Sequence, residues 1–219
     1  MKKVLIGLLL VLCVAGGFLY FWIFGPTKSA SGPIAAEHLG TVENTFRIDQ
    51  DRSEVRFIIH EELRGRPVDV VGSTHQVAGE AALDLDDLSS ARFGKIQVNA
   101  RTFATDEEMR NRMIRNRILS TDEYEFIDFQ PTSVSGLPSR AAVGDTVPFQ
   151  LNGDVTIRDI TRPLSLDAEL HVDSESELTI SATAKLSRAD FEIMIPQVPS
   201  VANVGDEIQL EIEAVAVPL

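Results

Sequence analysis

Apolar and polar residues alternate with a period of two through most of the chain from residue 45 onward. Successive side chains of a β-strand point to opposite faces of a sheet, so this alternation predicts strands with one apolar and one solvated face. The inward apolar rows are Val55, Phe57 and Ile59; Ile96, Val98 and Ala100; Val155 and Ile157; Leu164, Leu166, Ala168 and Leu170; Leu178, Ile180 and Ala182; and Ile208, Leu210 and Ile212. The chain is therefore expected to form an all-β, antiparallel domain.

Turn signals rich in glycine, proline, aspartate and serine separate these stretches at short spacing, as at residues 65–67, 84–90, 143–145 and 204–206. Eight or more antiparallel strands with one apolar face form either a sandwich or a barrel. We favour a β-barrel of about eight strands, because closure removes unpaired edges and such an interior holds either packed side chains or one small ligand.

Residues 101–129 depart from this alternating pattern. They are predicted to form a helical, basic insertion between strands. The whole protein has 20 lysines and arginines against 33 aspartates and glutamates, yet this segment alone holds Arg101, Arg110, Arg112, Arg115 and Arg117. Thr105, followed three residues later by Glu108, predicts a capping box at the start of a helix. The apolar residues that follow do not form one stripe, so we expect a helix that is broken or bent near Met113.

Residues 4–24 form an uncharged run of 21 residues. As a helix, such a run spans the roughly 30 Å of a bilayer core, and it is longer than the about 7–15 apolar residues of a cleaved signal peptide. We therefore expect a retained transmembrane helix. Lys2 and Lys3 precede the run, which favours a domain on the periplasmic side of the cytoplasmic membrane. The alternative is cleavage near Ala30 and a free periplasmic protein.

The composition divides the chain into three parts. We expect an anchor over residues 1–25, a flexible linker rich in Gly, Pro, Ser and Ala over residues 26–44, and one domain over residues 45–219. The net charge of −13 disfavours a nucleic-acid partner, because binding to a phosphate backbone needs a basic surface. The single cysteine, Cys13, lies in the apolar run and leaves the domain without a thiol.

The domain shows no constellation of catalytic residues, so we expect it not to be an enzyme. His60-Glu61-Glu62 begins like a zinc-protease helix but lacks the second histidine, and Gly94-Lys95-Ile96 lacks the first glycine and the Ser/Thr of a phosphate loop. The four histidines are scattered without ligand spacing. Neither a metal nor a cofactor is expected.

Three stretches of the domain carry more specific motifs. The first is the segment 101–129, with an apolar strand, a threonine cap, an arginine-bearing helix and an aromatic return strand. The second is the hairpin LNGDVTIRDITRPL at 151–164, and the third is LSRADFEI at 186–193, followed by Val204-Gly205-Asp206. In this order they resemble the YceI-like family, the polyisoprenoid-binding proteins of bacterial envelopes. The resemblance covers about residues 45–219 and implies a lipocalin-like barrel.

The resemblance also implies a function. It points to an elongated apolar cavity that binds and sequesters or carries a long-chain amphiphile, such as an isoprenoid quinone or a polyprenyl phosphate. The inward rows alone indicate only an apolar interior, which a packed core without a ligand explains as well. The alternative is therefore a ligand-free interaction or structural module of the envelope. The sequence leaves open whether the domain forms a homodimer.

The candidate ligand contacts are the inward-facing apolar residues and those of the expected helical lid. They are Val55, Phe57, Ile59, Val98, Phe103, Met113, Ile114, Leu119, Phe129, Val155, Ile157, Leu166, Ile180 and Leu210. Within this set, Met113, Ile114 and Leu119 are expected to close over the tail.

The helical arginines are the candidates for contact with a lipid head group. Arg110 and Arg112 have the carboxylates Asp106 and Glu108 four residues before them and can pair with these. Arg115 and Arg117 have no acid at that offset, so we expect one of them to bind an anionic or polar head group. The alternative is that both are solvated or pair with acids elsewhere, such as Asp122 and Glu123.

Overall fold

The computed structural model describes residue 20, residue 25 and residues 28–40, 44–196 and 201–219. The predicted transmembrane run therefore lies outside the described residues, apart from Tyr20. In the part of the chain that is described, no helix is both long and apolar enough to cross a membrane.

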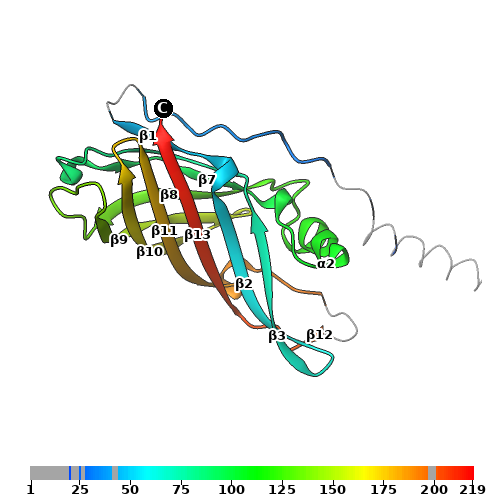
Figure 1. Cartoon of the computed structure of the whole chain (residues 1–219). Helices are drawn as coiled ribbons and strands as arrows, with labels where there is room; N and C mark the ends of the chain where they lie inside the picture. The colour runs from blue at the N-terminus through cyan, green and yellow to red at the C-terminus, as the bar shows by residue number, and fades with distance from the viewer. Residues whose placement is uncertain (1–19, 21–24, 26–27, 41–43, 197–200) are drawn as a thin grey trace, which may run out of the picture.

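The described residues contain 13 strands joined in one sheet (Figure 1). In chain order they are β1 (Thr45–Ile48), β2 (Glu54–Leu63), β3 (Arg66–Thr74), β4 (Val77–Ala78), β5 (Glu80–Ala82), β6 (Arg92–Phe93), β7 (Ile96–Asn99), β8 (Phe126–Ser135), β9 (Thr146–Ile157), β10 (Ile160–Ser174), β11 (Glu177–Ser187), β12 (Val201–Ala202) and β13 (Glu207–Pro218). The helical elements are η1 (Gln50–Arg52), η2 (Leu88–Ser90), η3 (Ala100–Thr102), α2 (Glu108–Met113), η4 (Ile114–Ile118) and η5 (Ala189–Phe191).

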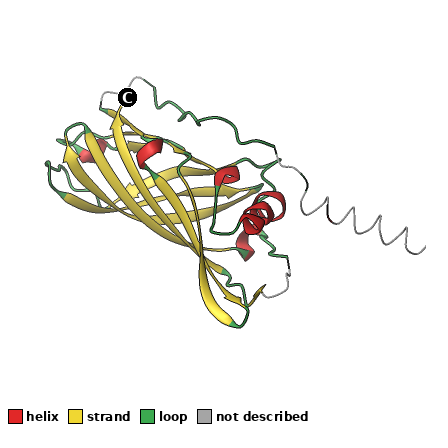
Figure 2. Cartoon of the chain, turned by 45° about the vertical axis from the view of Figure 1, so that its right-hand side comes forward, coloured by secondary structure: helices red, strands yellow, loops and turns green. Residues whose placement is uncertain are grey.

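The antiparallel pairings lead round a strongly curled sheet. β3 pairs with β2, β2 pairs with the first half of β13, and the order continues through β11, β10, β9 and β8 to β7. β7 then pairs with β4, which follows β3 after only two residues. The second half of β13 pairs with β1, which carries β5 and β6. Figure 2 shows the long strands running diagonally along this half-barrel, with the helical segment at one end.

The predicted all-β, antiparallel fold with an apolar inner face is confirmed. In β9, buried residues alternate with more exposed ones along the whole strand, from Thr146 to Ile157. The strands are more numerous than the expected eight or so, because one side of the sheet is built from pieces of two or three residues, namely β4, β5 and β6.

The α-helix of the insertion is interrupted where the sequence predicts a break or bend. The α-helix α2 ends at Met113 and continues as the π-helical turn η4. The predicted capping box is wrong: Glu107 is the N-cap, and its side chain accepts a hydrogen bond from the backbone N–H of Met109. The Thr105 backbone N–H and hydroxyl instead donate to the side-chain oxygen of the buried Asn111, at 2.7 and 2.8 Å, and the hydroxyl accepts from the Glu107 N–H at 3.3 Å.

Residues 28–40, here called the strap, differ from the flexible linker expected over residues 26–44. They lie along the domain (blue in Figure 1), and Ile34 within them is buried. The Ser31 N–H and hydroxyl both donate to the Glu125 carboxylate, at 2.6 and 2.8 Å, and the Leu39 N–H donates to Glu80 at 2.9 Å. Half-buried and buried carboxylates need such donors, and the strap supplies them.

Candidate ligand-binding site

The interior of the curled sheet is a continuous apolar volume formed by two clusters. The larger cluster is formed mainly by β8, β9, β10, β11, β13 and η5. The smaller consists of Val55, Val77, Val98, Ala100 and Phe103. Ile96, Leu119, Ile127 and Ile212 pack against both clusters and join them.

An apolar cavity of about 60 Å³ lies in this interior. On one side its wall is formed by β1 and the short strands β4, β5, β6 and β7, and on the other side by the long strands β9, β10, β11 and β13. Glu80 is the one charged residue along the wall, and its carboxylate is directed to the strap, where it contacts His38 Nδ1 at 2.7 Å and the Leu39 N–H at 2.9 Å. The space can therefore accept apolar groups only.

Alanines shape the long-strand wall of the cavity. Ala168 of β10 lies opposite Ala182 of β11, and β13 contributes Ala214 and Ala216. All four are buried, with exposed fractions of 6% or less. Because each alanine stands where a strand of this kind could carry a valine or leucine, the open volume depends on these small side chains.

Two of the predicted ligand contacts, Leu166 and Ile180, line the cavity. The other predicted contacts do not line the cavity. Val55, Val98 and Phe103 belong to the smaller cluster, Phe129, Val155 and Ile157 belong to the larger one, and Phe57, Leu119 and Leu210 pack against one or both. Ile59 and Ile114 are buried and Met113 is half-buried. None of the three lid residues lines the cavity as it stands.

Several cavity residues were not predicted. Phe46, Ile48 and Phe93 come from β1 and β6, which are too short for a clear alternation. Phe149 and Leu151 could have been found, because they extend the alternating row of β9 upstream of Val155.

The arginines of the helical segment are paired more fully than expected. Arg110 pairs with Asp106, and Arg112 Nε lies 3.3 Å from Glu108 Oε1, as the spacing predicts. Arg115 lies 3.1 Å from the same Glu108 oxygen, seven residues earlier. This is the alternative foreseen for Arg115, a pair with an acid elsewhere. Burial lowers the pKa of Arg117. A head-group role for Arg115 or Arg117 stays a prediction.

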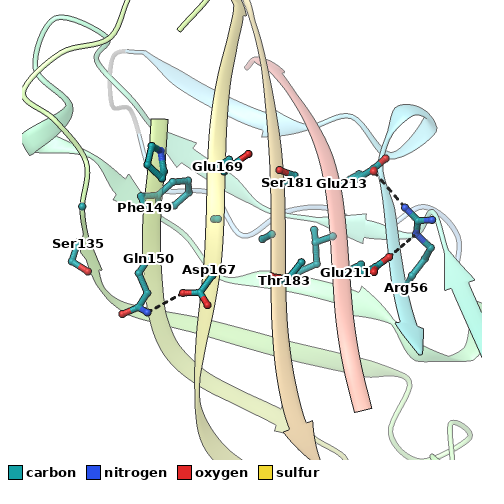
Figure 3. Close-up of a pocket in the computed structure, with 15 residues that line it drawn as sticks. Arg56, Ser135, Phe149, Gln150, Asp167, Glu169, Ser181, Thr183, Glu211 and Glu213 are labelled. Carbon is teal, nitrogen blue, oxygen red and sulfur yellow. Dashed lines mark hydrogen bonds and ion pairs between the residues drawn. The ribbon is translucent and has the colours of Figure 1, made fainter. Parts of the chain in front are cut away.

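A second recess, of about 840 Å³, lies on the outer face of the same long strands. Figure 3 shows polar side chains along it, with Gln150 donating to Asp167 at 3.0 Å and Arg56 set between Glu211 and Glu213, at 3.8 and 3.4 Å. Its polar lining makes it unsuited to a hydrocarbon tail. The inner cavity is therefore the candidate ligand site.

A buried arginine ties the helical segment to the strap. Arg101 is 7% exposed, donates to the Ser29 carbonyl at 2.8 Å and lies 3.0 Å from the Glu125 carboxylate. Burial alone would raise the pKa of Glu125, but the hydrogen bonds from Ser31 and Asn99 and the charge of Arg101 together hold the pKa below its ordinary value. Glu125 is therefore charged at neutral pH and fixes the strap.

A curled antiparallel sheet with an apolar interior and one short helix is the architecture of lipocalin-like domains. A family model described as the YceI-like domain matches residues 46–216. The chain therefore belongs to the YceI-like family, as the sequence motifs indicated. No curated protein matches it.

Solved structures of low sequence identity share the fold. BcnA of Burkholderia cenocepacia is 16% identical with a TM-score of 0.61, over 78% of this chain and 99% of that one. A polyisoprenoid-binding domain of Saccharophagus degradans, implicated in plant cell wall breakdown, is 10% identical with a TM-score of 0.62, over 80% and 98%. The YceI protein of Campylobacter jejuni is 18% identical with a TM-score of 0.53, over 68% and 84%.

Proposed function

We propose that this protein is a lipid-binding protein, not an enzyme, that holds the tail of a long-chain isoprenoid amphiphile inside the curled sheet. The ligand class is an isoprenoid quinone or a polyprenyl phosphate. The protein works at the periplasmic side of the cytoplasmic membrane, to which residues 4–24 attach it. Membership of the YceI-like family and the name of the Saccharophagus degradans domain support this ligand class.

The observation that carries the proposal is the alanine-walled cavity. Its lining offers hydrocarbon to a ligand, and Ala168, Ala182, Ala214 and Ala216 leave room where larger residues would fill the core. Burying one CH₂ from water contributes about 0.8 kcal/mol, so one isoprene unit contributes roughly 3–4 kcal/mol. A bilayer offers a tail nearly the same gain, so selectivity must come from the shape of the cavity and from the head group.

The volume of about 60 Å³ sets a condition on binding. Ligand pockets usually have about 300–1,000 Å³, so a long tail enters only if part of the wall moves. The side made by β5 and β6 is the weaker one, because β5 and β6 share two residue pairs, whereas β9 and β10 share twelve. Entry of a tail should therefore displace the short strands and leave the long ones in place.

The small volume also favours a second candidate, a ligand-free module whose interior is a packed core. Native mass spectrometry of the full-length protein decides between the two. The purified protein is offered an isoprenoid quinone, a polyprenyl phosphate and, for comparison, a straight-chain fatty acid. Lipid binding predicts a stoichiometric adduct with one of the isoprenoids. Absence of any adduct, both as purified and after all three offers, would leave the packed module as the function.

A further inference from the structure

We infer that the helical end of the domain rests against the bilayer surface, so that α2 and η4 face the lipid head groups. This inference rests on the membrane attachment included in the proposed function, and it adds which face of the domain meets the membrane. The helical end comprises α2, η4, the turn between β2 and β3, and the residues that follow η5. Salt bridges and pairings bring these parts together: Glu61 of β2 lies 3.4 Å from Arg110, and β12 pairs with Glu62 and Leu63.

The first observation is where the chain leaves the domain. The predicted transmembrane run ends at Phe24, and adjacent Cα atoms are about 3.8 Å apart. The carbonyl of the next residue, Gly25, accepts a hydrogen bond from Asn116 Nδ2 of η4 at 3.3 Å. The π-helical turn is thus held one residue from the end of the run. A linker free over residues 26–44 would have allowed any orientation.

The second observation is that the strap holds this arrangement over several further contacts. The Lys28 N–H donates to Asp122 at 2.9 Å and its Nζ donates to the Asp122 carbonyl at 3.1 Å. Ser29 and Ser31 then bind Arg101 and Glu125 behind the helix. The segment that emerges from the run is therefore attached to the domain from Lys28 onward, with little slack for the domain to turn.

The third observation is the distribution of charge between the two ends. The opposite end consists of residues 84–91, 135–145 and 173–177, which hold seven carboxylates and one arginine. Backbone hydrogen bonds between Ala141 and Leu85 and between Leu88 and Ser139 hold two of these loops together. At the helical end, residues 64–66, 105–125 and 192–196 hold six arginines and seven carboxylates. Anionic lipids repel the opposite end more strongly, which favours the approach of the helical end.

The fourth observation is that two apolar side chains are exposed at this end. Met109 of α2 is 58% exposed, and Met194, after η5, is 80% exposed. In Figures 1 and 2 the segment that follows η5 lies at the same end as α2. Unbranched apolar side chains at this position can enter the head-group region of a bilayer. The proposed docking face thus presents two methionines within a surface that is much less acidic than the opposite end.

The test measures the distance of single positions from the bilayer in the full-length protein. Cys13→Ser removes the native thiol, and Met109→Cys, Met194→Cys or Val143→Cys adds one site for a fluorophore. Val143 is the matched control, because it is 56% exposed and lies at the opposite end. The protein is reconstituted in vesicles of phosphatidylethanolamine and phosphatidylglycerol, with head-group nitroxide lipids in both leaflets. Quenching should be several times stronger at positions 109 and 194 than at 143. Equal quenching, none at 109, or stronger quenching at 143 would overturn the inference.

A pair of insertions tests the cause of the orientation. A flexible insertion of about 20 Gly and Ser residues reaches roughly 25 Å. Placed after Gly25, it separates the apolar run from η4 and should remove the difference in quenching between positions 109 and 143. Placed after Gly40, at the C-terminal end of the strap, it should leave this difference in quenching unchanged. An insertion after Gly25 without effect would contradict the role of the Asn116 contact. Bound lipid is measured by mass spectrometry in the same samples. A protein that binds no lipid can therefore be distinguished from one whose helical end does not face the bilayer.

Discussion

At the scale of single residues, Gly153 of β9 shows how closely the long strands approach one another. A Cβ atom at this position would lie 2.4 Å from the Gln130 backbone carbonyl and 2.7 Å from the Phe129 ring. The ring could turn aside, but the carbonyl belongs to the paired strand β8. Overpacking of this kind typically costs about 1–3 kcal/mol. We expect Gly153→Ala to lower the free energy of unfolding by an amount near the upper end of this range.

Urea denaturation of the variant measures this loss. Gly32→Ala is the control, because a Cβ atom there meets nothing within 4 Å, and a change within about 0.5 kcal/mol is expected. Equal stabilities of the two variants would show that β8 and β9 separate more easily than the structure indicates.

Glu125 gives the stability a predictable dependence on pH. Its pKa is lowered in the folded protein, so its contribution is fully present above the ordinary pKa of about 4.3 and is lost as the pH falls through the lower folded value. Wild type should therefore exceed Glu125→Gln in stability at neutral pH, and the difference should shrink below about pH 4.3.

The midpoints of urea unfolding at several pH values measure this difference. Because the variant retains all other titrating groups, subtracting its curve isolates Glu125. A difference that stays constant between neutral and acid pH would mean that the contacts of Ser31 and Arg101 do not depend on the carboxylate charge.

The predicted ligand contacts that line the cavity are those whose position depends on local pattern. Leu166 and Ile180 belong to alternating rows, and both line the cavity. The alanines opposite each other at Ala168 and Ala182 could not be predicted, because their meaning depends on the register between β10 and β11. The partner of Arg115 was missed because Glu108 lies seven residues earlier, two helical turns away on the same face, beyond the offset of four residues at which helical ion pairs are expected.

At the scale of elements, the two walls of the cavity differ in how firmly they are held. β4, β5 and β6 have two or three residues each, whereas β9, β10, β11 and β13 have 11 to 15. Few ladder hydrogen bonds make local opening less costly. The strap lies outside the weak wall, where Glu37 lies 3.2 Å from Lys95 and His38 lies 2.7 Å from Glu80.

Hydrogen exchange should reveal this asymmetry. Amides of β5, β6 and the strap should exchange hydrogen faster than those of β9 and β10. An isoprenoid ligand should alter the exchange rates chiefly in β5, β6 and the strap. Mass spectrometry of peptic fragments resolves the two groups. Uniform exchange, or a ligand effect confined to β9 and β10, would place the moving wall elsewhere.

The type of the strands and of the helix could be predicted from the sequence, but the position of the strap could not. The period-two alternation predicts the long strands, and the lack of a single apolar stripe predicts the interruption of the α-helix at Met113. The strap has no such pattern, and its place depends on Glu80, Arg101 and Glu125, which are distant in sequence. From its composition alone, a segment rich in glycine, proline and serine is predicted to be a flexible linker.

At the scale of the whole molecule, the curled sheet combines a rigid outer part with a small apolar interior. The outer recess over Gln150, Asp167, Glu211 and Glu213 is polar, and the cavity on the opposite face of the same strands is apolar. The proposed hydrocarbon ligand would therefore bind inside the sheet. The cavity would then have to grow from its 60 Å³ to admit a tail.

Filling the cavity tests most directly whether lipid binds there. Ala182→Leu adds three carbons to the apolar wall, and Thr183→Leu places the same leucine side chain on the outer face at the next residue of β11. If the tail occupies the cavity, isoprenoid affinity measured by native mass spectrometry should fall about tenfold or more in Ala182→Leu, which corresponds to at least about 1.4 kcal/mol. The affinity of Thr183→Leu should stay at the wild-type value, with both variants folded by circular dichroism. Unchanged isoprenoid affinity in a folded Ala182→Leu protein would contradict binding inside the sheet.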